Sequence, residues 1–267
     1  MNDRKVRGLV IITAFVLLFA GISLYILFDK QGIGKDKNNH YVNYNVNDYI
    51  EVSPVVFNNY NNVYSNINVS KIDIKNIDQN ITKEFITREE ELIGYISGYY
   101  REITANSSYV PVNTVSSSIK TQINGAVLSL FYKVDFNLDS NIFDDNIKSY
   151  VITTNIDLGT NKILTKDDLL SKYNYTRSYI ADKLFNDDVL IEKNQIVIDK
   201  NTNMSLTRND IERKKDEYVK RIISEFDNII DMYIENGSLV LVYDTKELKG
   251  IFFDNEFDTD IKFRYLK

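Results

Sequence analysis

Acidic and amide side chains gather between residues 135 and 146, and their oxygens are of the kind that binds calcium. The spacing departs from that of an EF-hand loop, because Ser140 stands where a glycine belongs and Asn146 where a bidentate glutamate belongs. We therefore expect either a weak calcium loop or solvated turn carboxylates. The candidate ligands are Asp135, Asn137, Asp139, Asn141, Asp144 and Asp145.

A second acidic run, from Asp254 to Asp260, alternates carboxylates in a similar way near the C-terminus. Its twelfth position is Tyr265, which supplies no carboxylate for a calcium ion. We interpret this run as solvated acidic residues.

Histidine and cysteine chemistry has little basis in this sequence, which holds one histidine and no cysteine. His40 lies in a polar stretch that predicts a linker, where a solvated side chain is the ordinary case. Zinc sites, disulfides and a Ser-His-Asp triad are therefore not expected, and the nucleotide-binding motifs GxxxxGK[ST] and GxGxxG are missing. We predict no cofactor and assign no catalytic residue. A carboxylate pair for glycoside hydrolysis stays open, because an acidic chain offers many candidates.

The composition points to an acidic protein of bacterial origin. The net charge is −6, whereas nucleic-acid binding needs a basic face, so we do not expect nucleic acid as a partner. The chain is rich in Asn, Ile, Lys, Tyr and Asp, which AT-rich codons supply, and a secreted eukaryotic domain would normally carry disulfides. We infer a low-GC Gram-positive bacterium.

One long uncharged stretch runs from Gly8 to Phe28. Its 21 residues would cover roughly 30 Å as a helix, which is the thickness of the hydrocarbon core of a bilayer. Arg4, Lys5 and Arg7 precede it, which predicts a cytoplasmic N-terminus, a single pass through the cell membrane and an extracellular C-terminal domain. The alternative is a cleaved signal peptide, whose apolar region would be shorter, about 7–15 residues.

The rest of the chain divides by composition and periodicity. After a cytoplasmic tail at 1–7 and the expected transmembrane helix at 8–28, we predict a linker at 29–48 and α+β subdomains at 49–105 and 106–267. Alternating apolar residues predict strands, and helical spacing predicts helices. The expected strands are 63–74, 115–123, 126–138, 150–158 and 195–198, and the expected helices are 81–103, 165–170, 179–185 and 207–230.

Local motifs support several of these elements. Thr165 begins a Thr-Lys-Asp-Asp run that predicts a capping box, and Asn236-Gly237 lies between alternating apolar runs, which predicts a hairpin over 231–244. Within the helix 81–103, Glu89 to Glu91 are expected to face water. The predicted fold class is therefore α+β, an antiparallel sheet with helices packed on one face, preceded by one N-terminal transmembrane helix.

Three stretches together resemble a bacterial extracytoplasmic family. SYVITTNIDLGTNKILTKDDLL, from Ser149 to Leu170, is similar to that family's strand ending in a D-L-x-T-G-K-x-I-T-L-K-D-L pattern. DMYIENGSLVLVYDTKEL, from Asp231 to Leu248, is similar to its F-Y-I-T-D-x-G-L-V-F-Y-F-x-P-Y-E-I hairpin, and the segment 53–66 is faintly similar to its opening strand region. The family is a pair of domains of unknown function found in lysozyme-sensing anti-sigma factors and beside the catalytic domain of some peptidoglycan deacetylases.

The resemblance has clear departures. The family's Gly- and His-containing loop is replaced here by residues 141–148, which hold neither, and Pro-Tyr-Glu is replaced by Thr245-Lys246-Glu247. Seven residues before the apolar stretch cannot form an anti-sigma domain, and the deacetylase histidines are missing. The resemblance therefore implies the architecture and a sensing or binding role, but neither known activity.

These observations lead to three hypotheses. The first is a membrane-anchored, non-catalytic extracytoplasmic module that binds or senses a cell-wall component or an envelope protein. The second is a structural subunit of a membrane or envelope complex, which would use small residues of the apolar stretch for helix packing. The third is a carboxylate-dependent cell-wall hydrolase.

Overall fold

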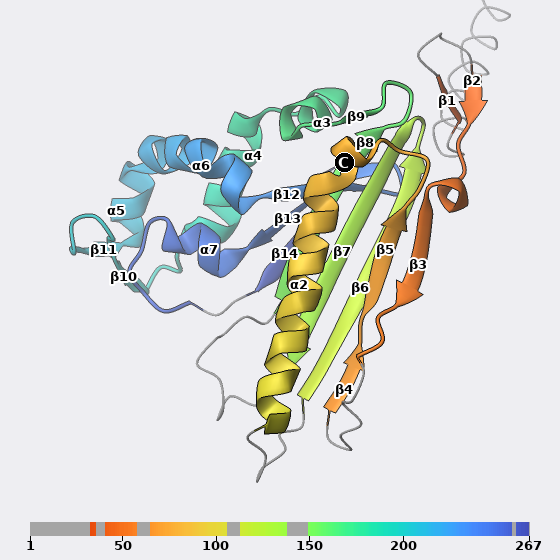
Figure 1. The fold of residues 1–267 in the computed structure, drawn as a ribbon. Coiled ribbons are helices and arrows are strands. Elements are labelled where there is room, and N and C mark those ends of the chain that lie inside the picture. The colour runs from red at the N-terminus through yellow and green to blue at the C-terminus, as the bar shows by residue number, and fades with distance from the viewer. Residues whose placement is uncertain are drawn as a thin grey trace, which may run out of the picture.

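The computed structural model describes residues 33–35, 41–57, 65–105, 113–137, 149–257 and 260–266 (Figure 1). Its central element is a five-stranded sheet with the order β4-β6-β7-β8-β9. Strand β4 runs parallel to β6, and the other neighbours are antiparallel. The strands are β4 (Ser65–Asn68), β6 (Asn113–Asn124), β7 (Val127–Asn137), β8 (Ser149–Asp157) and β9 (Lys162–Ile163).

Helix α2 (Gln79–Ala105) lies along one face of this sheet (Figure 1). It buries one apolar stripe, with Phe85, Leu92 and Ile96 at helical spacing, as the sequence predicts. The small sheet of β3 (Ile50–Pro54) and β5 (Ser70–Ile74) closes the same core.

Glu89 departs from the expectation that it faces water. It lies on the buried side of α2 with 3% exposure, and its carboxylate accepts a hydrogen bond from the Ile72 backbone N–H at 2.7 Å. Strand β5 packs against α2, and the buried Ile72 N–H takes Glu89 as its hydrogen-bond acceptor. Helix periodicity alone does not show that a distant strand packs there.

A second sheet has the order β12-β13-β14 and is antiparallel throughout. The predicted hairpin is confirmed, because Asn236 and Gly237 at its turn both have positive φ, 52° and 75°. The strands are β12 (Asp231–Glu235), β13 (Ser238–Asp244) and β14 (Ile261–Leu266).

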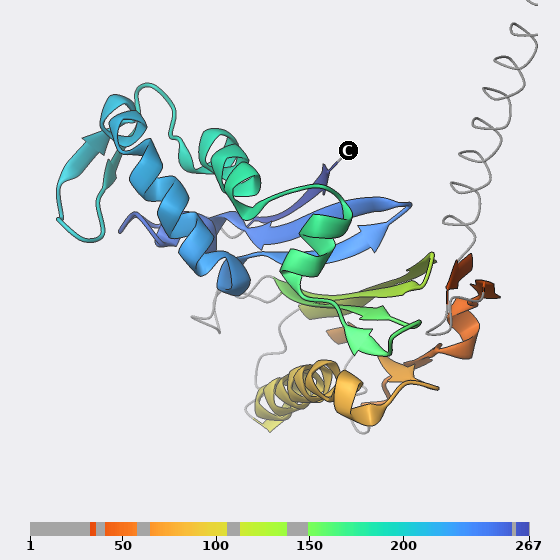
Figure 2. The same cartoon turned by 90° about the horizontal axis from the view of Figure 1, so that it is seen from above.

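Helices cover one face of this second sheet (Figure 2). The capping box at Thr165 is confirmed, because its hydroxyl oxygen accepts from the Asp168 backbone N–H while the Asp168 side chain bonds back to Thr165. The single helix expected over 207–230 is instead two helices that meet at Lys214. The helices are α3 (Lys166–Lys172), α4 (Arg177–Leu184) with a π-helical turn (Phe185–Val189), α5 (Arg208–Arg213), α6 (Lys215–Ile229) and α7 (Thr245–Gly250).

Short elements complete the described chain. Strands β10 (Ile196–Ile198) and β11 (Ser205–Thr207) form a hairpin beside α5, and β1 (Ile33–Lys35) pairs with β2 (Tyr41–Asn43) ahead of a 3-10 turn (Val46–Asp48).

The two sheets pack against each other, and this packing explains the burial of β7 on both faces. Leu130 and Tyr132 face the core that holds α2, whereas Phe131 packs against Tyr233 and Val240 of the second sheet. Figure 2 shows the resulting order of helix α2, first sheet, second sheet and outer helices.

The predicted fold class is wrong in its arrangement. The described chain is α+β, but it forms several sheets rather than one, with one parallel strand pair, and the five-stranded sheet is covered by a helix on one face and by another sheet on the other. The alternation of side chains along β7 predicts a strand, but it does not show which element packs on the second face of that strand.

The expected transmembrane helix is not supported by the structure. None of the helices in the described ranges combines the length and the apolar character needed to cross a bilayer. Residues Gly8 to Phe28, on which the expectation rests, lie outside the described residues.

Candidate functional site

Strand β12 crosses the five-stranded sheet and is bound to it by buried polar side chains. The Asn155 side-chain amide of β8 donates to the Met232 carbonyl at 2.8 Å. The Ser129 hydroxyl of β7 donates to the Asn155 Oδ1 at 2.7 Å and accepts from the Ile234 N–H at 2.7 Å. These bonds satisfy polar groups that would be costly to bury alone.

The same crossing continues to β6. Gln122 Oε1 accepts from the Asn236 N–H at 2.7 Å, so the residues of β12 and its turn lie over β8, β7 and β6 in succession. Asp231 therefore lies at the β8 end of β12, and Glu235 lies at the β6 end. Each of these carboxylates belongs to a different charged cluster.

A groove lies at the Asp231 end, where β8 meets β12, β13, α6 and α7, and we call it the junction groove. It consists of three adjoining parts, a wide part of about 930 Å³, a middle part of about 200 Å³ and an inner pocket of about 340 Å³. Asn228 lines all three parts, Glu247 lines the wide and middle parts, and Asp231 lines the middle part and the inner pocket. The wide part and the inner pocket each lie within the usual size range of ligand sites, about 300–1,000 Å³, and the three parts together exceed it.

Opposite charges face each other across the inner pocket. Lys166 from α3, Arg88 from α2 and Asp231 all line it. Burial lowers the pKa of Lys166 and raises the pKa of Asp231, while the attraction between the two charges opposes both shifts. Among the described residues, no ion pair joins Asp231 to Lys166 or Arg88, so these charges interact across space without direct contact.

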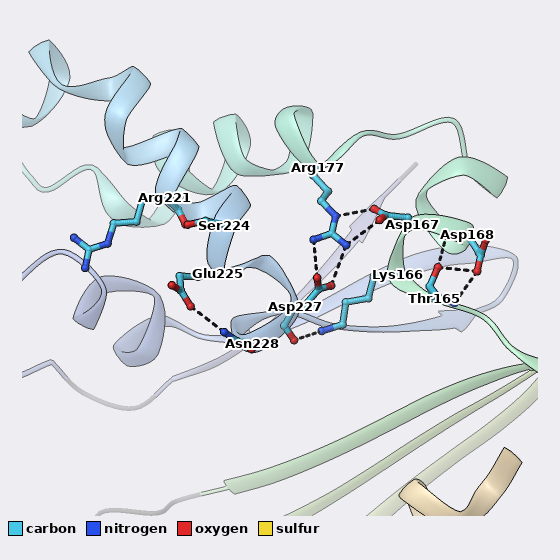
Figure 3. Close-up of polar contacts among 10 residues, drawn as sticks. All are labelled: Thr165, Lys166, Asp167, Asp168, Arg177, Arg221, Ser224, Glu225, Asp227 and Asn228. Atoms are coloured by element: carbon cyan, nitrogen blue, oxygen red, sulfur yellow. Dashed lines mark hydrogen bonds and ion pairs between the residues drawn. The ribbon is translucent and has the colours of Figure 1, made fainter. Parts of the chain in front are cut away.

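Arg177 of α4 fixes the side of the inner pocket that carries Lys166 (Figure 3). Its guanidinium binds Asp167 at 2.6 Å and Asp227 at 2.8 Å, and it lies over the Phe226 ring at 4.9 Å. The hydrogen bond from Arg177 lowers the pKa of Asp227. The Asp227 carbonyl in turn accepts from the Lys166 ammonium at 2.6 Å, which ties α3, α4 and the end of α6 together.

The wide part of the groove carries mixed charge. Burial, together with the charges of Asp244 and Asp231, raises the pKa of Glu247. Glu225 of α6 accepts a hydrogen bond from the Asn228 amide at 2.9 Å, as Figure 3 shows. The cations and aromatic rings of this part are Lys200, Arg221, Lys246, Tyr150 and Phe257.

The Glu235 end of β12 carries a closed cluster, which we call the aromatic end. Lys120 forms an ion pair with Glu235 at 2.9 Å and lies 5.7 Å and 5.6 Å from the ring centres of Phe131 and Tyr233. The hydroxyls of Tyr233 and Tyr265 both donate to Glu235, at 2.9 Å and 2.5 Å. These bonds lower the pKa of Glu235 against the effect of burial.

The calcium loop expected from the sequence stays a prediction. Asp135 is described, and it forms an ion pair with Lys133 at 2.7 Å and accepts a hydrogen bond from Ser149. Asn137 ends strand β7. The remaining candidates, Asp139, Asn141, Asp144 and Asp145, lie outside the described residues, as does His40.

The second acidic run is partly described. Asp260 forms an ion pair with Lys262 at 2.8 Å, and Asp258 lies outside the described residues. Within the ranges that the structure covers, no three acidic, histidine or cysteine side chains lie together in a way that could hold a metal ion.

Comparison of the chain with models of protein families gives no match, and comparison with curated proteins gives none.

Sequence reasoning missed the residues of the inner pocket. Lys166 lies inside the capping-box run and Asp231 at the first position of the predicted hairpin, so local structure alone explains both residues. A usable signal was present at Asp231, because a carboxylate between Ile230 and the apolar strand residue Met232 is unusual unless it faces a polar site. Arg88 offered no signal, since charged residues on an amphipathic helix normally face water.

Proposed function

We propose that this protein is an extracytoplasmic, non-catalytic binding or sensing module of a low-GC Gram-positive cell envelope, and that it takes a cell-wall component in the junction groove. The observation that carries the proposal is the groove itself, which is large, open and lined by both cations and anions together with two aromatic rings. Aromatic faces beside amides and charges suit a polar polymer whose segments carry sugars and charged peptides.

The sequence supports the envelope location independently of the groove. The uncharged stretch at 8–28 follows a basic segment, and the acidic remainder is unsuited to nucleic acid. The resemblance to extracytoplasmic domains that sense lysozyme or accompany peptidoglycan enzymes covers β8 to α3 and the β12–β13 hairpin. Those elements also border the groove.

The test is retention of the purified full chain on insoluble peptidoglycan. Asn228 is exposed and lines every part of the groove, so Asn228→Trp should obstruct the place where the three parts adjoin without disturbing a core. The matched control is Asn209→Trp, the same change at an exposed position of α5 away from the groove. We expect retention of the wild type and of the control, and loss in the groove variant.

Equal retention of both tryptophan variants would contradict the proposed groove, and no retention of any form would contradict wall binding. A parallel column carrying lysozyme tests the envelope-protein alternative. Protease added to intact cells tests the location, since a chain that stays uncut is not on the outside.

A second candidate function is a carboxylate-dependent wall hydrolase, which one observation favours. Asp231 and Glu247 both line the middle part of the groove, and burial raises the pKa of each. A raised pKa is what a general acid requires. Release of soluble fragments from labelled peptidoglycan by the wild type, and its loss in Asp231→Asn, would establish this activity in place of simple binding.

A further inference from the structure

We propose that the inner pocket of the junction groove binds a small zwitterion of the amino-acid class, with its carboxylate toward Lys166 and Arg88 and its ammonium toward Asp231. The inference rests on the proposed function, because it names the chemical group that the inner end of the groove recognises.

The pocket has the size and the walls for such a ligand. Its volume is about 340 Å³, near the lower limit for small-molecule sites, which is about 300 Å³. The buried apolar side chains of Phe85, Leu169 and Met232 contribute to its walls, beside a lining that is more polar than apolar. Polar groups that converge on a pocket fix the orientation of a small ligand.

The charged side chains of the pocket have few close hydrogen-bond partners among the described residues. Lys166 has three donors, and among the described residues one of them is used, by the Asp227 carbonyl. Within the described ranges, the one side-chain hydrogen bond that Asp231 accepts is a long one from Thr153, at 3.4 Å. Arg88 makes an equally long bond to the Val151 carbonyl at 3.4 Å.

Partly buried charges that are not paired with each other carry a desolvation penalty, which a group of opposite charge can offset. A ligand that carries one anionic and one cationic group could pair with the two cations and with Asp231 at the same time. Two further carboxylates line the pocket, Glu84, which is exposed, and Asp227, which Arg177 already binds. A simple anion would leave Asp231 unmatched, and a simple cation would leave Lys166 and Arg88 unmatched.

The arrangement is held from outside the pocket. Arg177 joins Asp167 and Asp227, and through the Asp227 carbonyl it fixes the Lys166 ammonium, so this cation stays in place when the pocket is empty (Figure 3). Sites with positioned supporting contacts lose less entropy on binding than mobile ones.

Binding should also move a proton. The other charged groups that line the two parts of the groove containing Asp231 are the cations Lys166 and Arg88 and the anions Glu84, Asp227, Asp244 and Glu247. Burial raises the pKa of Asp231 despite the two cations. A bound ammonium would lower that pKa again, so any proton that Asp231 holds in the free chain would be released on binding.

The experiment is calorimetric titration of the full chain with alanylalanine, and then with N-acetyl-alanylalanine and alanylalanine amide, which lack the ammonium and the carboxylate charge respectively. We expect the free dipeptide to bind and each capped form to bind at least about tenfold more weakly, since an unpaired buried charge costs more than 1.4 kcal/mol. Lys166→Met and Asp231→Asn should each weaken the free dipeptide by a similar factor. Lys120→Met at the aromatic end should leave it unchanged.

Titration in two buffers of different ionisation enthalpy, repeated at several pH values, reports a proton released on binding, and this release should disappear in Asp231→Asn. Equal binding of free and capped dipeptides would overturn the inference, and this result does not depend on whether a variant folds. No binding of the free dipeptide by a chain that is still retained on peptidoglycan would overturn it while leaving the proposed function intact. If the chain neither binds the free dipeptide nor is retained on peptidoglycan, the proposed function itself is contradicted.

Discussion

Strand β12 carries a charged cluster at each end, and the two clusters differ in how far the protein itself satisfies them. At the aromatic end, Glu235 receives an ion pair from Lys120 and hydrogen bonds from two tyrosine hydroxyls. At the groove end, Asp231 faces Lys166 and Arg88 without contacting either. A satisfied cluster fixes two sheets against each other, whereas an unsatisfied one beside a cavity indicates a ligand.

The largest expected effect concerns the packing behind the aromatic end. Phe131 has 1% exposure and lies between the sheets, 4.7 Å from the Tyr233 ring centre. Phe131→Ala should lower the free energy of unfolding by about 3–5 kcal/mol in urea denaturation, because it removes a buried ring and leaves a cavity. Phe263→Ala, at a ring with 38% exposure, is the control with a clearly smaller loss. A loss at Phe131 no greater than at Phe263 would mean that the sheets do not depend on this contact.

Glu89 provides a third carboxylate, which is buried but faces no described cavity. Burial raises its pKa to about 7 from 4.5, although the Ile72 N–H and Lys71 oppose that shift. The native state therefore holds its proton to higher pH than the unfolded state, and stability from this group is lost as the pH rises from about 4.5 to about 7. The free energy of unfolding of Glu89→Gln should equal that of the wild type near pH 4.5 and exceed it by about 3 kcal/mol above pH 7.

Urea denaturation of both proteins across this pH range checks the sign and the size. A variant whose advantage does not change with pH would show that the carboxyl is not protonated in the folded state.

The fold was predictable where local chemistry decides it. The Asn236-Gly237 turn, the Thr165 capping box and the apolar stripe of α2 all follow from short-range rules and are present. Strands β11 and β14 and helix α7 were not predicted, since they are short or depend on partners far away in the chain.

The candidate site was less predictable than the fold. The groove is formed by α2, α3, β8, α6, β12 and α7, and no spacing within one segment can show that Arg88, Lys166 and Asp231 meet. Sequence reasoning instead selected residues 135–145, where carboxylates are dense, and density along the chain does not imply convergence in space.

A moderate effect is expected where β12 is bound to the first sheet. Asn155 has 4% exposure and connects Ser129 to the Met232 carbonyl. Asn155→Ala should lower the free energy of unfolding by about 1–3 kcal/mol, because it leaves buried polar groups without partners. Since β12 positions both clusters, we also expect weaker dipeptide binding. A variant of unchanged stability would show that water replaces the amide.

The smallest effect is expected at the ion pair of the aromatic end. Lys120 has a side chain that is 44% exposed, so Lys120→Met should cost only about 0.2–1 kcal/mol in the same denaturation experiment. A loss well above that range would mean that the pair is far less screened by solvent than its exposure indicates.

The contrast between the two ends of β12 is tested most directly by backbone amide NMR of the full chain during titration with alanylalanine. We expect concentration-dependent shifts at Lys166, Asp231 and Asn228, and no shifts at Lys120 and Glu235. Shifts confined to Lys120 and Glu235 would contradict the proposed site. Absence of shifts at both ends up to about 10 mM dipeptide would also contradict it, since that concentration exceeds a weak dissociation constant of roughly 1 mM.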